Sequence, residues 1–139
     1  MRSITLIIIH CSAVRPWQQS SAKKIDEWHR AKHWKCIGYH YVVRRDGSIE
    51  LGRPLEKPGA HCVGHNRYSI GICYEGGLNA AGEEADTRTP EQRATLRKLV
   101  KQLHQRFPKA VIVGHRDLNP GKKCPCYDAV GEYRDLQPP

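Results

Sequence analysis

The chain has 139 residues, of which 23 are Lys or Arg and 14 are Asp or Glu, so its formal net charge is +9 when the histidines are neutral. This length fits a single domain over residues 1–139 and is sufficient to bury a core without disulfide bonds. No repeat or low-complexity tract divides it, which excludes a repeat architecture. The positive charge predicts attraction to a polyanion such as nucleic acid, anionic lipid or a bacterial wall polymer.

The amino terminus, MRSITLIIIHCSA, contains an apolar run that stops at His10. This run is too short for a signal peptide and for a membrane span, so we expect synthesis in the cytoplasm and no membrane insertion. In that compartment cysteines are more often thiols or metal ligands than disulfides. The sequence has six of them: Cys11, Cys36, Cys62, Cys73, Cys124 and Cys126.

The first half of the chain predicts a strand, a helix and a hairpin. Ile4–Ile9 is a continuous apolar run that is typical of a strand buried on both faces, and His10 follows at its carboxyl end. Ser20 and Ser21 can cap a helix that runs to about Lys35. A hairpin is then predicted by Asp46-Gly47, which separates the segments 39–45 and 48–51.

The second half predicts two strands around a long helix. Ser69–Tyr74 is the first strand candidate, and Ala110–Val113 is the second, directly before His115. Between them, Thr89 and Gln92 form the pattern of a capping box with Pro90 at the first helical position. The core-facing stripe of this helix has spacings of three and four residues and consists of Leu96, Leu99, Val100, Leu103 and Phe107.

Strands that alternate with helices predict an α/β domain in which helices flank a central mixed sheet. His10 and His115 would then each lie at the carboxyl end of a strand, where ligands usually bind in open α/β sheets. Cys124 follows His115 by nine positions. Two histidines and one cysteine, with water in a fourth position, are the composition of a catalytic zinc site rather than a structural one.

This ligand set, His10, His115 and Cys124, predicts Zn²⁺ at the strand ends, where the metal would lower the pKa of water and polarise a carbonyl group. The alternative is structural. Both histidines would then bond to the backbone at strand ends, and Cys124 and Cys126 would be small buried thiols. Because Cys126 lies only two residues after Cys124, we expect it to be a packed thiol in either case.

Four segments together resemble one family. They are IIIHCSA (7–13), IGYHYVVRRDGSIELGR (37–53), GAHCVGHNRYSIGICYEGG (59–77) and GHRDLNPGKKCPCYD (114–128). In this order they resemble the zinc-dependent N-acetylmuramoyl-L-alanine amidases of type 2, which include phage lysozyme-like endolysins and peptidoglycan recognition proteins. The resemblance implies hydrolysis of the amide bond between N-acetylmuramic acid and L-alanine in peptidoglycan, with zinc held by His10, His115 and Cys124.

The resemblance also implies that Tyr39 and Lys122 act beside the metal. A tyrosine hydroxyl and a lysine ammonium directed at the carbonyl oxygen would stabilise the negative charge that develops there. From the residues alone, Tyr39 could instead be a half-buried strand residue, and Lys122 and Lys123 could be solvated loop charges. His61 could line the substrate groove or support a zinc ligand, and His40 is the weaker candidate.

The chain departs from one branch of the family. Members that recycle wall fragments carry a glutamate general base where this chain has Cys73, and they tend to use aspartate where it has Cys124. Both differences favour the phage lysozyme-like branch. Glu75 would lie roughly 7 Å further along the same strand face. Its role as a base is a hypothesis that Glu75→Gln can test.

The remaining alternatives are a recycling amidase, a non-catalytic peptidoglycan-binding module and a nucleic-acid-binding domain. The complete ligand set argues against the binding module, and the scattered basic residues argue against nucleic acid as a partner. We therefore expect a monomer whose partner is peptidoglycan and which reaches the wall after release or delivery. Among the tryptophans, Trp17 lies in a polar loop and is the expected substrate contact, whereas Trp28 and Trp34 are expected on the first helix, in the core.

Overall fold

The structure is a computed structural model that describes residues 1–139. Its centre is a five-stranded sheet with the strand order β3-β2-β4-β1-β5. The strands are β1 (Leu6–Cys11), β2 (Tyr41–Val43), β3 (Ile49–Leu51), β4 (Ser69–Tyr74) and β5 (Val111–Gly114). All neighbouring pairs are parallel except β2 and β3, which form the predicted hairpin. The predicted α/β fold with a central mixed sheet is therefore confirmed.

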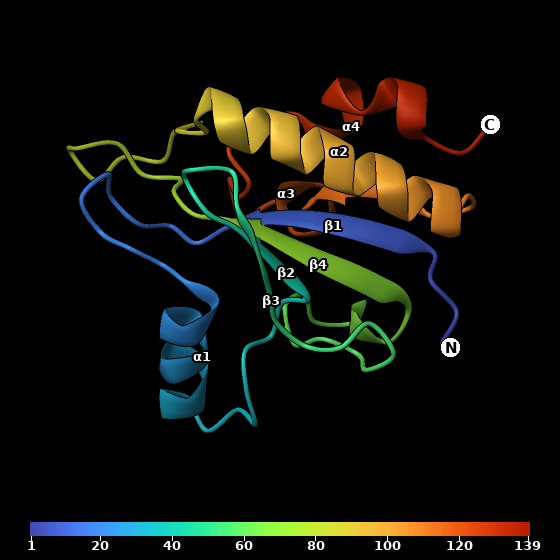
Figure 1. Cartoon of the computed structure of the whole chain (residues 1–139), viewed down its shortest axis with the longest axis horizontal. Coiled ribbons are helices and arrows are strands. Elements are labelled where there is room, and N and C mark those ends of the chain that lie inside the picture. Colours follow the sequence, from blue (N-terminus) through green and yellow to red (C-terminus); the bar gives the residue numbers. More distant parts are fainter.

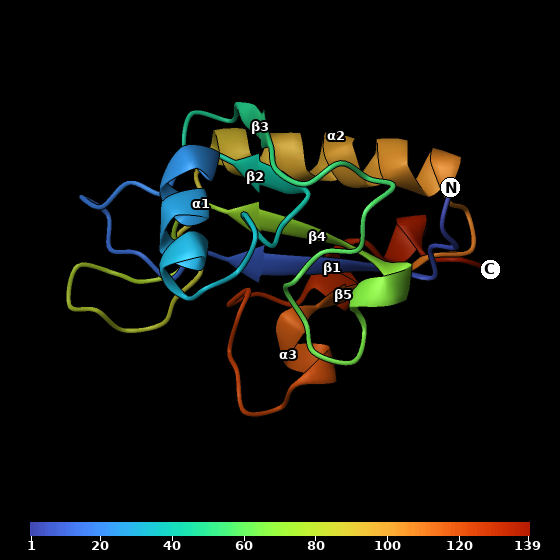
Figure 2. The same ribbon diagram turned by 90° about the horizontal axis from the view of Figure 1, so that it is seen from below.

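Helices cover the two faces of this sheet unequally. They are α1 (Ala22–Ala31), α2 (Pro90–Arg106), α3 (His115–Leu118) and α4 (Ala129–Glu132), with 3₁₀ turns η1 (Asn66–Tyr68) and η2 (Arg134–Leu136). The long helix α2 crosses one face (Figure 1), and the view from below has α1 and the segment 53–68 in front of the sheet with α2 behind it (Figure 2). None of these helices is long and apolar enough to span a membrane.

Side-chain alternation along β1 separates the core from the open face. Ile7 and Ile9 are fully buried in the large cluster that includes the apolar stripe of α2. Ile8 belongs to a small cluster on the other face with Cys62 and Val113. Because successive residues of a strand point to opposite faces, His10 shares the face of Ile8.

The start of α2 agrees with the sequence pattern. The Thr89 side chain accepts from the Gln92 amide, and the Gln92 side chain accepts from the Thr89 amide at 3.0 Å, which completes the capping box. The same Gln92 side chain donates to the carbonyl oxygens of Val43 and Glu75. Since these carbonyls lie at the ends of β2 and β4, this cap also fixes the helix to the sheet.

The predicted boundaries of the first helix and of the first strand were wrong by a few residues. The first helix ends at Ala31 rather than near Lys35, because His33 adopts a left-handed conformation with φ 68° that no α-helix continues. The chain then turns back, and the Trp34 ring lies 4.5 Å from the His29 ring. The first strand begins and ends two residues later than expected, so His10 lies inside β1, paired in register with Cys73 of β4.

Candidate active site

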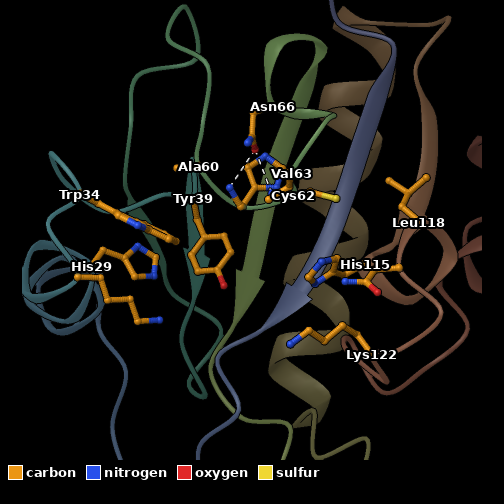
Figure 3. Close-up of a pocket in the computed structure, with 13 residues that line it drawn as sticks. His29, Trp34, Tyr39, Ala60, Cys62, Val63, Asn66, His115, Leu118 and Lys122 are labelled. Carbon is orange, nitrogen blue, oxygen red and sulfur yellow. Dashed lines mark hydrogen bonds between the residues drawn. The ribbon is translucent and has the colours of Figure 1, made fainter.

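An open groove of about 800 Å³ lies on the sheet face opposite α2 (Figure 3). Its lining combines residues from α1, the segment between α1 and β2, the 60–66 segment and the region after β5: His29, Lys32, Trp34, Tyr39, Ala60, His61, Cys62, Val63, Asn66, His115, Leu118, Asn119 and Lys122. None of these residues is acidic and two are lysines. The groove is therefore electrostatically suited to an anionic or electron-rich ligand.

Three residues that are far apart in the sequence meet beside this groove, and one of them, His115, also lines it. His10 comes from β1, His115 is the first residue of α3, and Cys124 lies in the loop before α4. One ligand atom from each lies within 4.8 Å of the other two. A tetrahedral zinc ion holds its nitrogen and sulfur ligands about 3 to 4 Å apart, so this donor set fits zinc once the three ligand atoms move slightly closer together.

The two histidines are in the form that a metal requires. Burial holds the pKa of His10 well below its usual value, and the neighbouring His61 and His115 lower it further. Burial also lowers the pKa of His115, with a smaller contribution from the positive charge of Lys122. Both imidazoles are therefore neutral at physiological pH, and neutral imidazole is the metal-binding species.

Hydrogen bonds fix the loop that carries Cys124. The Cys11 amide donates to the Cys124 sulfur at 3.1 Å, and the Arg116 amide donates to the Cys124 carbonyl at 2.7 Å. The buried Tyr74 hydroxyl donates to the carbonyl of Pro125 at 2.6 Å. The third residue of the metal group is thus attached both to β1 and to β4, although its own segment is irregular.

Cys126 points away from this group, toward the core. Its sulfur lies 3.6 Å from the carbonyl oxygen of Gly77, and its side chain packs against the main hydrophobic cluster. It is absent from the group of three ligand atoms. The expectation that Cys126 is a packed thiol is confirmed.

Tyr39 and Lys122 point into the groove from opposite walls (Figure 3). Tyr39 precedes β2 and is half-buried, with its ring centroid 5.0 Å from that of His10. Burial raises the pKa of Tyr39 well above its usual value, so its hydroxyl remains a hydrogen-bond donor. Lys122 is exposed and close enough to His115 to affect its pKa, whereas Lys123 does not line the groove.

Glu75 lies outside the groove and has another role. Its carboxylate accepts from the Ser20 amide at 2.6 Å, and from the Arg44 guanidinium and the Arg45 amide at 3.0 Å each. Burial opposes ionisation, but these hydrogen bonds outweigh it and lower the pKa of Glu75. The carboxylate therefore joins β4 to the loop before α1 and to the end of β2.

The sequence analysis missed one wall of the groove. His29, Lys32 and Trp34 line it, and the Lys32 ammonium lies 5.6 Å from the centroid of the Trp34 ring. Trp17, the expected substrate contact, is 65% exposed and does not line the groove. Trp34 was missed because a helix predicted to run to Lys35 includes it, whereas the helix ends at Ala31 and leaves Trp34 to line the groove.

Comparison with known proteins identifies the family. Residues 1–127 match the family described as N-acetylmuramoyl-L-alanine amidase. The chain belongs to this family. It is 38% identical over 120 residues to the endolysin of Enterobacteria phage K11, covering 86% of this chain and 79% of that protein. It is 37% identical over 126 residues to the endolysin of Escherichia phage T7, covering 91% and 83%.

A solved structure with a similar fold supports the assignment. The N-acetylmuramoyl-L-alanine amidase LysC from Clostridium intestinale URNW superposes with a TM-score of 0.82 at 31% identity, covering 97% of this chain and 86% of LysC. The family resemblance expected from the four sequence segments is therefore confirmed, and the chain is a peptidoglycan amidase.

Proposed function

We propose that this amidase is zinc-dependent and that His10, His115 and Cys124 hold the metal. The observation that supports it is the convergence of three ligand atoms within 4.8 Å, beside the groove that His115, Tyr39 and Lys122 line. With three protein ligands, one coordination position would remain for water or substrate, as in catalytic zinc sites. Zinc bound there would polarise the scissile carbonyl and lower the pKa of a water molecule.

The protein's own residues would stabilise the charge that develops during hydrolysis. Attack on the lactyl carbonyl places negative charge on its oxygen. The protonated Tyr39 hydroxyl and the Lys122 ammonium are donors on opposite walls of the groove, directed at the space between them (Figure 3). Preformed donors of this kind stabilise the transition state because they do not need to reorient when the charge appears.

The substrate proposed for this groove is the glycan-linked stem peptide of intact peptidoglycan. The groove is open, contains no acidic residue and is lined by two lysines, Lys32 and Lys122. The net charge of +9 would hold the protein near an anionic wall by an attraction that salt weakens. We further propose that it acts on the wall as a monomer after release or delivery.

The test is to incubate the purified protein with intact peptidoglycan, with and without a zinc chelator, and to detect released stem peptides by mass spectrometry. We expect peptides with a free amino-terminal alanine, no release after chelation, and restored release after zinc is added back. A His115→Ala variant should remain inactive when zinc is added. Release that resists chelation would refute zinc dependence. A zinc-loaded protein that binds the wall without cleaving it would identify a recognition module.

A further inference from the structure

The ring of His61 packs closely against two glycines. A Cβ atom at Gly71 of β4 would lie 2.7 Å from the His61 ring, and one at Gly59 would lie 2.6 Å from the same ring. Real Cβ atoms do not approach other heavy atoms so closely. Both positions must therefore lack a side chain for the ring to lie where it does.

Both ring nitrogens of His61 have partners. Its Nδ1 lies 2.9 Å from Nε2 of His10, and its Nε2 lies 3.3 Å from the hydroxyl oxygen of the buried Ser69. Although His61 lines the groove, neither nitrogen is free for a substrate. The role of a direct substrate ligand is therefore disfavoured, and the contact with His10 becomes the informative one.

Only one proton fits between the two facing nitrogens, so the hydrogen bond has two possible directions. If His61 donated from Nδ1, His10 would carry its own proton on Nδ1 and could not bind a metal through either nitrogen. If His10 donates from Nε2, its Nδ1 is unprotonated and available. In the second direction His61 carries its own proton on Nε2 and donates it to the hydroxyl oxygen of Ser69.

We propose that His61 is a positioning residue that accepts a hydrogen bond from Nε2 of His10 and thereby presents Nδ1 of His10 to the metal. This inference rests on the proposed zinc site. A metal-binding histidine almost always donates its other ring N–H to a fixed acceptor, which selects the tautomer and the orientation of the ring. Here the acceptor is a second imidazole, which is oriented in turn by its contact with Ser69 and by close packing against Gly59 and Gly71.

Two substitutions separate the acceptor from the bulk of the ring. The leucine of His61→Leu fills part of the space that the ring occupies against Gly59 and Gly71 but cannot accept a hydrogen bond. His61→Asn places a carbonyl oxygen near the position of Nδ1. His65→Ala is the matched control, because His65 lies in the same loop but contacts Tyr68 and not His10. Circular dichroism and melting curves would establish that each variant is folded before any metal is added.

The first measurement is long-range ¹H–¹⁵N NMR of the metal-free wild type, which distinguishes protonated from unprotonated ring nitrogens. We expect His10 to carry its proton on Nε2. The second is zinc affinity, measured by competition with a chromophoric chelator. We expect a 10- to 100-fold weaker affinity for His61→Leu, by analogy with other supporting residues around zinc, partial or full recovery in His61→Asn, and no change in His65→Ala.

The outcomes distinguish this inference from the proposed function. A His10 ring protonated on Nδ1 in the metal-free protein would overturn the positioning role. So would a folded His61→Leu variant that binds zinc as tightly as the wild type while the wild type cleaves peptidoglycan. A wild type that binds no zinc at all would instead overturn the metal centre itself. Weakened binding in His61→Leu with recovery in His61→Asn would support the inference.

Discussion

Replacing Tyr39 by phenylalanine removes one hydroxyl group and little else. The ring would keep its contacts with the His10 and His29 rings, whose centroids lie 5.0 and 5.7 Å away, so we expect a change in the free energy of unfolding below about 1 kcal/mol. Loss of one oxyanion donor typically lowers kcat by about 10²- to 10³-fold, or roughly 2.7–4 kcal/mol of transition-state stabilisation. We expect Tyr39→Phe to fall within this range and to retain zinc.

The assay is the steady-state release of stem peptide from a soluble muropeptide, with zinc content measured on the same sample. Because burial raises the pKa of Tyr39 well above its usual value, the hydroxyl stays protonated through neutral pH. The ratio of wild-type to variant kcat should therefore be constant between about pH 6 and pH 9. A variant with nearly full kcat would refute the donor role, and so would one that has lost its zinc.

Three further predictions concern other ionisable side chains. Lys122→Ala should lower kcat by about 10²- to 10³-fold with zinc retained, whereas Lys123→Ala should not, as measured in the same assay. Glu75→Gln should keep most of its kcat but should lose about 2–3 kcal/mol of stability in urea denaturation, because the arginine and amide partners would no longer face a buried carboxylate. A selective loss of kcat would instead support the general-base hypothesis. Burial lowers the pKa of both His29 and His40 to about 4, so protonation favours the unfolded chain. The metal-free protein should lose about 1.4 kcal/mol per pH unit for each of these two histidines as the pH falls from 6.5 toward 4, and a melting temperature that stays constant over that interval would contradict this.

Much of the fold could be predicted because the buried elements have strong local signals. The capping box at Thr89 and the apolar stripe of α2 are local patterns, and the structure contains both. The apolar run before His10 indicates a strand buried on both faces, which β1 is. These signals depend on hydrophobic periodicity and backbone hydrogen bonding, and distant residues do not change them.

The parts that could not be predicted depend on contacts between distant segments. The end of α1 is set by the left-handed conformation of His33 and by the return of Trp34 onto His29, neither of which has a local sequence signal. The partner of His61 could not be chosen from sequence, because its contact with His10 spans 51 positions. For the same reason the carboxylate of Glu75 could not be assigned to structural partners before the fold was known.

The proposed metal centre combines ligands of different rigidity, and this determines which substitutions would disturb it. His10 lies inside a strand that pairs with both neighbours, whereas Cys124 lies on an irregular loop. That loop is held to the sheet by the Cys11 amide and by the Tyr74 hydroxyl, which reaches Pro125 from the core side of β4. The core residue Tyr74 is thus attached directly to the loop that carries Cys124. A substitution that shifts Tyr74 should therefore disturb zinc binding, even though Tyr74 itself is fully buried and does not line the groove.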